Sequence, residues 1–304
     1  MPARAWPETV RHEFLAWWTI SGSADITKVN VLDALNSAAK CGGTMEAMLE
    51  ELSHTIEGGV GTLVEKMFAD SGAEVFLGNA VVEVTDRGDH AALRLSGGQV
   101  LLSGEGSPGG EQGGDRRRGV LRAGGVGVPW RFTAAARAGS PPPLRPAQAR
   151  LAREKHQGRA IKMLMRVRGA HPGTLVTGEA EGLRLMFAER NLSDGSTLII
   201  GFGLYDEVPD TSHAAMSRAV TRFFPEATLL EHDWHDWIRD PWSAGTWVSH
   251  GLGQSPLFAG PEWAQKGRLH FATSDIAACE SGWFEGAVLS GEAAADAILS
   301  TRRP

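Results

Sequence analysis

The sequence predicts an α+β fold. Apolar residues recur every three to four positions in much of the first 57 residues, which is the spacing of helices that pack against a core. Several short apolar segments between residues 75 and 203 are bounded by glycine-rich or polar turns, which is typical of strands. The 304 residues are enough for one large domain or two ordinary ones.

Residues 1–57 are predicted to be helical. Apolar side chains within 14–18 and again within 31–39 follow helical spacing, and Asp25 or Asn30 is a candidate cap for the second of these helices. The methionines and leucines of 45–52 indicate a further short helix.

Residues 58–103 combine one helix with short strands. A glycine-rich turn precedes an amphipathic helix that we expect from Thr62 to Asp70, with a stop at Ser71-Gly72. The strands predicted after this helix are Val75–Leu77, Val81–Thr85 and Ala91–Leu95.

Residues 104–143 interrupt this pattern. Ten of the 24 residues in 104–127 are glycine, and the region also holds three consecutive arginines and three consecutive prolines. Such a segment buries too little apolar surface to offset the entropy of ordering it, so we expect it to be disordered or aberrant. Its G-x-G-x-x-G at Gly104–Gly109 is rejected as a dinucleotide fingerprint, because Pro108 prevents the helix that must follow.

Residues 144–250 are predicted to form a second mixed unit, and 251–304 a C-terminal segment. The elements expected here are helices over 145–156, 214–224 and 285–299, and strands over 160–168, 183–189, 197–203 and 268–272. The tryptophan-rich stretch 227–250 is expected to be irregular.

Composition excludes several classes of protein. The net charge of −6 and the isoelectric point near 5.9 argue against a general nucleic-acid binder. No apolar run approaches the roughly 18–20 residues of a membrane span, the first residues lack a signal-peptide core, and two cysteines are too few for a disulfide framework. A cytoplasmic protein is expected. No metal site is expected either, because the spacing of the His and Asp residues in 232–236 matches no known ligand set.

The stretch from Gly267 to Leu299 has the features of a cofactor-binding end. It predicts a strand, a polar turn, a small-residue stretch and a helix. Gly282 and Gly286 would let a large planar group approach the backbone, and the amino end of the helix near Glu285 would favour an anionic edge of a cofactor. The plain alternative is a C-terminal helix that packs on a sheet.

This stretch resembles the closing FAD-binding motif of flavin-containing amine oxidases, the monoamine oxidase family. The family pattern F-A-G-T/S-E/D-x-A is matched by Phe271–Ala277, and S-G-Y/F/W-x-E/D-G-A-V/I-x-S-G by Ser281–Gly291. Thr273 departs from it, since the family usually has glycine there. Weaker likenesses to the family extend to Gly58-Gly59 with Leu63-Val64, Ala80–Val84, Ser140–Leu144, Ala160–Met163, Trp237 and Trp242–Trp247.

Two departures from the family stand out. The likeness begins after the βαβ unit that carries the glycine-rich FAD fingerprint, so the resemblance implies a substrate domain of mixed sheet and helices plus a partial FAD-binding domain. Residues 104–139 replace a family strand. A shifted reading frame would explain this tract, a hypothesis that an intact frame on resequencing the gene would remove.

The resemblance implies roles for particular residues. Trp247 and Trp283 would form two aromatic walls beside the amine, and Lys162 would hold a water near the flavin N5 and assist the reaction with oxygen. Core tryptophans and a surface lysine are the alternatives. Thr246 stands where some relatives have the cysteine that bonds the flavin, so non-covalent FAD is implied. The cofactor-binding residues that the resemblance implies are Val81, Trp237, Ser274, Asp275, Gly282, Trp283 and Phe284.

The implied reaction is oxidative deamination of a small-molecule primary amine, with oxygen as acceptor. No arginine is clearly placed to hold a substrate carboxylate, which ranks amines above amino acids. A different interpretation remains open: an inactive fragment, or a subunit that a separate chain or a homodimer completes.

Overall fold

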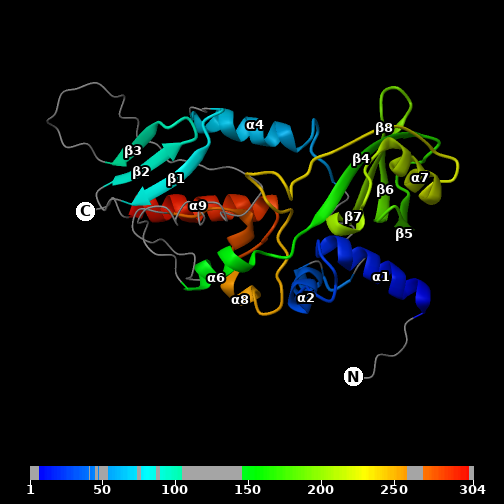
Figure 1. The fold of residues 1–304 in the computed structure, drawn as a ribbon, viewed down its shortest axis with the longest axis horizontal. Helices are drawn as coiled ribbons and strands as arrows, with labels where there is room; N and C mark the ends of the chain where they lie inside the picture. The colour runs from blue at the N-terminus through cyan, green and yellow to red at the C-terminus, as the bar shows by residue number, and fades with distance from the viewer. Residues whose placement is uncertain are drawn as a thin grey trace.

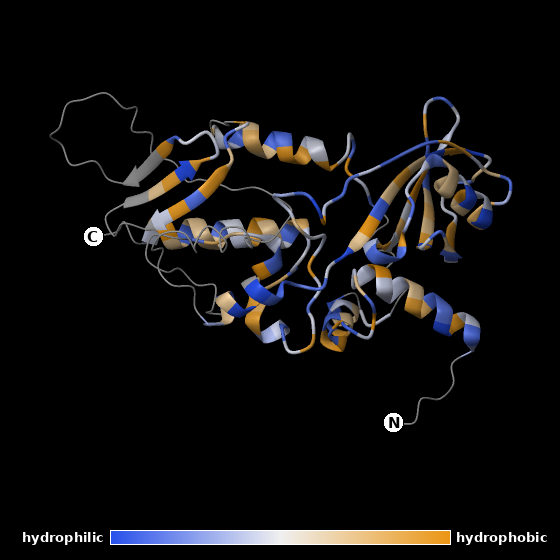
Figure 2. Ribbon diagram, viewed as in Figure 1, coloured by the Kyte–Doolittle hydropathy of each residue, from blue (hydrophilic) through white to orange (hydrophobic). Residues whose placement is uncertain are grey.

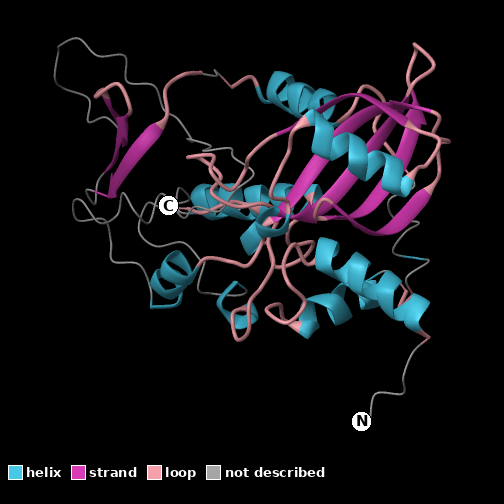
Figure 3. Cartoon of the chain, turned by 45° about the vertical axis from the view of Figure 1, so that its right-hand side comes forward, coloured by secondary structure: helices cyan, strands magenta, loops and turns pink. Residues whose placement is uncertain are grey.

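The computed structural model describes residues 7–40, 42–44, 47, 54–73, 77–86, 90–104, 146–258 and 270–300. They form two groups of elements (Figures 1 and 3). One is built on a five-stranded sheet, and the other contains a three-stranded sheet and the long C-terminal helix. Sheets and helices are both present, as the sequence predicts, but all the strand pairs described are antiparallel rather than mixed.

The larger sheet is antiparallel, with the strand order β5-β6-β7-β4-β8. Its strands are β4 (Ala160–Arg168), β5 (Leu175–Ala180), β6 (Leu183–Asn191), β7 (Thr197–Leu204) and β8 (Thr228–Trp234). Along β4, Met163, Met165 and Val167 are fully buried, whereas Lys162 and Leu164 point to the opposite, exposed side. This alternation of two places one face of the sheet in the core.

One helix covers the buried face of this sheet (Figure 3). It is α7 (His213–Phe223), which Ser212 caps by accepting a hydrogen bond from the amide of Ala215. Its Met216 and Val220 are fully buried in one cluster with the inward side chains of β4 and β6. The 3-10 turn η1 (Tyr205–Glu207) connects β7 to the segment that precedes this helix.

The first amino-terminal helix packs against the same sheet, and the second follows it (Figure 1). Helix α1 (Glu8–Ser21) contacts β5, β6 and β7, and its Trp18 is buried. Helix α2 (Val31–Lys40) begins after Asn30, whose side chain accepts a hydrogen bond from the amide of Leu32. Of the two candidate caps for this helix, Asn30 is therefore the one that is confirmed.

The second group surrounds the C-terminal helix α9 (Phe284–Ser300). Its other elements are α4 (Val60–Ser71), β1 (Val81–Asp86), β2 (His90–Leu95), β3 (Val100–Gly104), α6 (Pro146–Glu154), α8 (Ser255–Phe258) and η3 (Ser274–Ile276). Strands β1, β2 and β3 form an antiparallel sheet in that order. A small core of Leu151, Phe258 and Ile276 joins α6, α8 and η3.

Several sequence-based boundaries need correction. Residues 22–30 form turns and a bridge, so the first 57 residues are not helical throughout. The stretch 227–250 was expected to be irregular but contains β8, and β3 and β5 were not predicted. Residues 270–272 are not a strand, and Leu77 lies in a turn. The remaining parts of the strands predicted over 75–77 and 268–272, the helix over 45–52 except Ala47, and nearly all of 104–143 lie outside the described residues.

In the described part of the chain, no helix combines the length and apolar character needed to cross a bilayer.

Candidate functional site

Lys162 lies on the side of the larger sheet that faces away from the core. It pairs in register with Phe202 of β7, so both side chains emerge on the same face. The Lys162 ammonium lies 5.8 Å from the centre of the Phe202 ring, which is within range of a cation–π interaction. The Phe202 ring therefore holds the Lys162 side chain in place, next to a second aromatic residue.

That second side chain is Trp247. Its ring meets Phe202 edge-on, with centroids 6.2 Å apart and planes at 84°. Its indole Nε1 donates a 3.1 Å hydrogen bond to the carbonyl of Ser21 at the end of α1. Lys162, Phe202 and Trp247 thus form one continuous row, which we call the Lys162–Phe202–Trp247 row.

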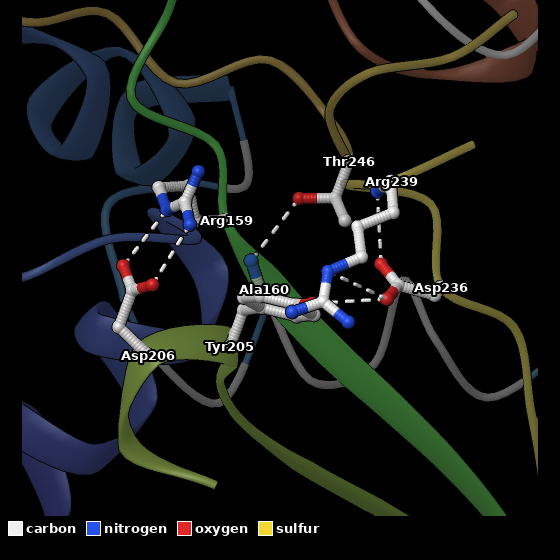
Figure 4. Close-up of polar contacts among 7 residues, drawn as sticks. All are labelled: Arg159, Ala160, Tyr205, Asp206, Asp236, Arg239 and Thr246. Atoms are coloured by element: carbon white, nitrogen blue, oxygen red, sulfur yellow. Dashed lines mark hydrogen bonds and ion pairs between the residues drawn. The ribbon is translucent and has the colours of Figure 1, made fainter. Parts of the chain in front are cut away.

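A buried hydroxyl pair fixes the backbone on which this row stands. The hydroxyls of Ser23 and Thr246 lie 2.8 Å apart, and both lie within hydrogen-bond distance of the amide of Ala160, at 2.9 and 3.1 Å. Figure 4 shows the Thr246 contact at the start of β4. Three segments that are distant in the sequence therefore meet at the amide of Ala160. Ala160 lies two residues before Lys162, and Thr246 lies directly before Trp247.

A second polar network ties the loop before Trp247 to β7 (Figure 4). The Tyr205 hydroxyl donates to Asp236 at 2.9 Å, and this bond raises the pKa of the tyrosine above its usual value. The guanidinium groups of Arg159 and Arg239 lie 5.5 and 6.0 Å from the tyrosine ring centre. Arg159 also donates two 2.8 Å hydrogen bonds to Asp206. These contacts hold the 236–240 turn against the end of the sheet.

The turn that precedes α9 approaches the Trp247 segment. Gly282 donates its amide to the carbonyl of Ser274, and a Cβ at Gly282 would lie 3.1 Å from a methyl group of Val248. Gly282 and Val248 therefore touch, and each is the chain neighbour of one tryptophan, Trp283 or Trp247. Trp283 is 58% exposed and Phe284 53% exposed at the start of the helix.

Gly286 fixes how α9 meets this turn. A Cβ at this position would lie 2.1 Å from the carbonyl oxygen of Glu280, so only glycine permits the observed packing. The hydroxyl of Ser290, one turn further, accepts a hydrogen bond from the amide of Thr273. Sequence reasoning proposed that this glycine serves the approach of a planar group, whereas in the structure it serves the approach of the protein's own backbone.

Asp275 is a buried carboxyl group in η3. Ser274 donates to its Oδ1 at 3.3 Å, while its Oδ2 has no hydrogen-bond partner among the described residues. Burial raises the pKa of Asp275 to about 6. A buried oxygen of this kind is suited to accept a hydrogen bond from a bound molecule.

Two of the expected cofactor residues lie apart from the Lys162–Phe202–Trp247 row. Val81 opens β1, pairs with Leu95 and is half-buried in the smaller sheet. Trp237 is 42% exposed and packs edge-on against His235 at 4.2 Å. Its carbonyl accepts the amide of Gly245, so its backbone, not its ring, connects it to the Trp247 segment.

The histidines and aspartates of 232–236 form ordinary structural contacts. His232 contacts the carbonyl of Thr211, and His235 pairs with Asp240 at 3.0 Å. Across the described residues, no group of three His, Cys, Asp or Glu side chains is arranged to hold a metal ion.

Comparison with known proteins decides the family. The family model described as flavin containing amine oxidoreductase matches residues 14–299. The chain belongs to this family. Flavin is the redox cofactor of the family, as the C-terminal motif predicts.

Relatives and solved structures agree with this assignment. The chain is 33% identical over 146 residues to (S)-6-hydroxynicotine oxidase of Paenarthrobacter nicotinovorans, covering 48% of this chain and 34% of that protein. It is 24% identical over 293 residues to pseudooxynicotine dehydrogenase of Pseudomonas sp, covering 94% of this chain and 50% of that protein. The chain therefore spans between a third and a half of these curated relatives.

The fold is similar to that of cyclohexylamine oxidase from Brevibacterium oxydans IH-35A. The TM-score is 0.68 at 18% identity, and the match covers 98% of this chain and 66% of that structure. At this identity the likeness concerns the fold alone. The mixed helix and sheet architecture is thus that of a flavin amine oxidoreductase.

The residues present fit a flavin nucleotide. The unpartnered Oδ2 of Asp275 is an acceptor of the kind that the cofactor's hydroxyl groups require. Gly282 has no side chain, so the turn before α9 stays open beside the segment that carries Trp247.

The sequence did not reveal Phe202, Ser21 and Ser23, which position Lys162 and Trp247. No local motif marks contacts between residues so distant in the chain.

Proposed function

We propose that this chain forms the substrate side and the C-terminal flavin segment of an FAD-dependent amine oxidase. The observation that carries this proposal is the Lys162–Phe202–Trp247 row, which lies next to the glycine turn that leads into α9. The substrate is a primary amine. It loses two electrons and two protons to give an imine, which water converts to an aldehyde or ketone and ammonia. Oxygen accepts the electrons and two protons to give hydrogen peroxide.

Bound FAD would supply the acceptor for the hydride equivalent that leaves the amine α-carbon. The protein's part is to orient the amine and to keep the site apolar. The indole face of Trp247, and that of Trp283 across the glycine turn, attract the amine nitrogen and restrict its approach. The Lys162 ammonium, held by Phe202, would position a water and stabilise the negative charge that develops on oxygen during its reduction.

The names of the relatives support an amine substrate. Proteins named for oxidation of hydroxynicotine, pseudooxynicotine and cyclohexylamine all act on nitrogen compounds. Trp247 and Trp283 present flat apolar surfaces that suit such molecules.

We also propose that FAD is held without a covalent bond. Thr246 has a hydroxyl group, which cannot form a thioether, and this hydroxyl contacts Ser23 and Ala160 in the interior. Cys279, in the C-terminal segment, is exposed.

Purification of the chain with added FAD tests these proposals. We expect a flavin absorbance near 450 nm that remains after desalting, hydrogen peroxide production with a panel of primary amines, and release of the flavin into the supernatant after acid precipitation. Flavin that stays attached to the precipitated protein would contradict non-covalent binding. Flavin binding without peroxide production from any amine would contradict the oxidase.

Lys162→Met is expected to slow the reoxidation of the reduced flavin by oxygen by about 100-fold, because a positioned acid–base group is lost. The methionine keeps the contact with Phe202 but removes the charge. Stopped-flow absorbance after anaerobic reduction measures this step directly. The matched control is Arg168→Met, which removes an exposed charge from the far end of the same strand. Equal reoxidation rates in the two variants would remove Lys162 from the oxygen reaction.

A second candidate is an inactive fragment or a subunit that needs a second chain. It is favoured by the apolar residues of α4 and α9, which Figure 2 marks along both helices and several of which are exposed. On α4, Val60, Val64, Met67 and Phe68 are all between 39% and 43% exposed, and on α9 Val288 and Leu289 are 36% and 38% exposed. Faces of this kind are typical of an interface. Either of two results would establish this alternative. The first is flavin that is retained only after co-expression with a chain that carries the glycine-rich fingerprint. The second is a native mass of two copies of this chain.

A further inference from the structure

Ser23 lies in the turn that ends α1, and its side chain reaches two other segments of the chain. It is fully buried, with its Oγ 2.8 Å from the Thr246 hydroxyl and 2.9 Å from the Ala160 amide, which donates to it. The Ser23 carbonyl also accepts a hydrogen bond from the amide of Arg159 at 2.6 Å. One residue thus fastens the end of α1 both to the start of β4 and to the Trp247 segment.

The same turn also holds the Trp247 side chain. The indole Nε1 donates to the carbonyl of Ser21, two residues before Ser23, at 3.1 Å. The Ser23 hydroxyl contacts Thr246, the residue directly before the tryptophan. The turn therefore constrains both the backbone that carries the indole and the direction in which the indole points. Because the indole meets Phe202 edge-on, loosening the turn would move the indole against that ring.

Serine is an unusual residue at this point of the turn. Ser23 has a φ of 54°, the left-handed conformation in which many helices end, and glycine is the residue that adopts it without strain. Gly22 lies next to it but has a φ of −76°. The chain therefore carries a side chain where the backbone favours none. The polar group of that side chain is the hydroxyl that contacts Thr246 and Ala160, which indicates that the hydroxyl is needed there.

We propose that Ser23 is a positioning residue of the amine site: its hydroxyl holds Thr246, and through it keeps the Trp247 indole in place as the wall against which a flat amine lies. This inference rests on the proposed function, because it assigns the indole to the substrate. Ser23 is fully buried and its hydroxyl contacts protein groups, so it acts through Trp247 and not on the amine. A flat ring depends on an aromatic wall more than a slender alkyl chain does. Loss of the hydroxyl should therefore reduce the preference for flat amines.

The first experiment follows the indole groups and needs no cofactor. A nitrogen–proton correlation spectrum contains one indole signal for each of the ten tryptophans, and the signal of Trp247 is the one absent from Trp247→Phe. In Ser23→Ala we expect this signal to shift upfield, because the hydrogen bond to Ser21 loosens. Thr246→Val removes the other hydroxyl but keeps the side-chain shape, and it should give the same shift. Thr246→Ser keeps the hydroxyl and should keep the wild-type signal.

Ser249→Ala is the matched control for this measurement. Ser249 lies two residues after Trp247 and is also buried, but its hydroxyl has no hydrogen-bond partner among the described residues. Its removal should leave the Trp247 signal unchanged. Ser23→Gly guards against a misfolded Ser23→Ala protein, because glycine adopts the left-handed conformation freely and so removes the hydroxyl without straining the turn. It should shift the signal as Ser23→Ala does.

The second experiment compares a flat and a slender primary amine, benzylamine and butylamine, on the full chain loaded with FAD. The ratio of their kcat/KM values is independent of the amount of active enzyme, so a mere loss of folded protein leaves it unchanged. In Ser23→Ala and Ser23→Gly we expect the ratio of benzylamine to butylamine to fall about fivefold, the effect of one hydrogen bond of typical net strength. In Ser249→Ala it should equal the wild-type ratio.

The outcomes separate the ways of failing. An unshifted Trp247 signal in the Ser23 variants, or an unchanged amine ratio where the signal does shift, would overturn the proposal. So would a Ser249→Ala protein that matches Ser23→Ala in both measurements, since the effect would then be a general loosening of the segment. Shifted signals in a chain whose wild type oxidises no amine would contradict the proposed function, while the hold of Ser23 on Trp247 stands.

Discussion

Replacing Gly286 with alanine is expected to abolish flavin binding and to destabilise the protein by about 3 kcal/mol, the upper range for overpacking a tight contact. The added methyl group would lie 2.1 Å from the Glu280 carbonyl oxygen, and that oxygen belongs to the backbone, which cannot rotate away. The helix preference of alanine over glycine recovers only about 1 kcal/mol. Urea unfolding and flavin absorbance after desalting measure the two effects.

Gly291→Ala is the matched control for this prediction. Gly291 lies on the same helix, and no atom of the described residues lies within 4 Å of the place a Cβ would take. This variant should gain stability slightly and keep its flavin. A Gly286→Ala protein that is as stable as Gly291→Ala would show that the turn over 277–282 does not pack on α9 as described.

Trp247→Ala is expected to lower kcat/KM for amine oxidation by about 100-fold, a loss of the size that removal of a substrate-positioning group produces. The change removes one wall of the proposed amine site, the edge-on contact with Phe202, and the hydrogen bond to Ser21. Peroxide production measured across substrate concentrations separates kcat from KM. Trp247→Phe keeps an aromatic wall and loses the hydrogen bond, so we expect it to retain most of the activity.

Trp242→Ala serves as the comparison within the same segment. Trp242 is 51% exposed, and among the described residues its ring has no contact like the one between Trp247 and Phe202. Its removal should leave kcat/KM unchanged. Similar losses in Trp242→Ala and Trp247→Ala would assign the effect to disturbance of the segment, and the aromatic wall would have to be placed elsewhere.

The interior strands could be predicted from the sequence, whereas most edge strands could not. The bounds of β4 match the prediction, since its buried methionines and valine alternate with exposed residues. The unpredicted strands β5, β8 and β3 all lie at the edge of a sheet. An edge strand buries fewer side chains and tolerates polar ones, as Glu231 and Asp233 in β8 show, so the period of two is weak in its sequence.

Some residues of the candidate site could be proposed from the sequence, because a motif or strand alternation marks them. The C-terminal pattern singled out Asp275, Gly282 and Trp283, and strand alternation placed Lys162 on the face away from the core. The partners of these residues were not predictable. Phe202 pairs with Lys162 only through sheet register, and Ser23 meets Thr246 across 223 residues of sequence. Contacts of this kind come from tertiary packing and leave no local signal.

The hydrogen bond from Trp247 to Ser21 has a consequence for biosynthesis. Its two residues are 226 positions apart, so α1 emerges from the ribosome long before its partner exists. Until β5, β6 and β7, which α1 contacts, have also been made, its apolar side, including Trp18, remains uncovered, and an uncovered apolar surface invites aggregation or chaperone capture. Nascent chains halted before residue 175 should therefore be protease-sensitive around α1, and protection of its carboxyl end should be completed only when residue 247 has been made.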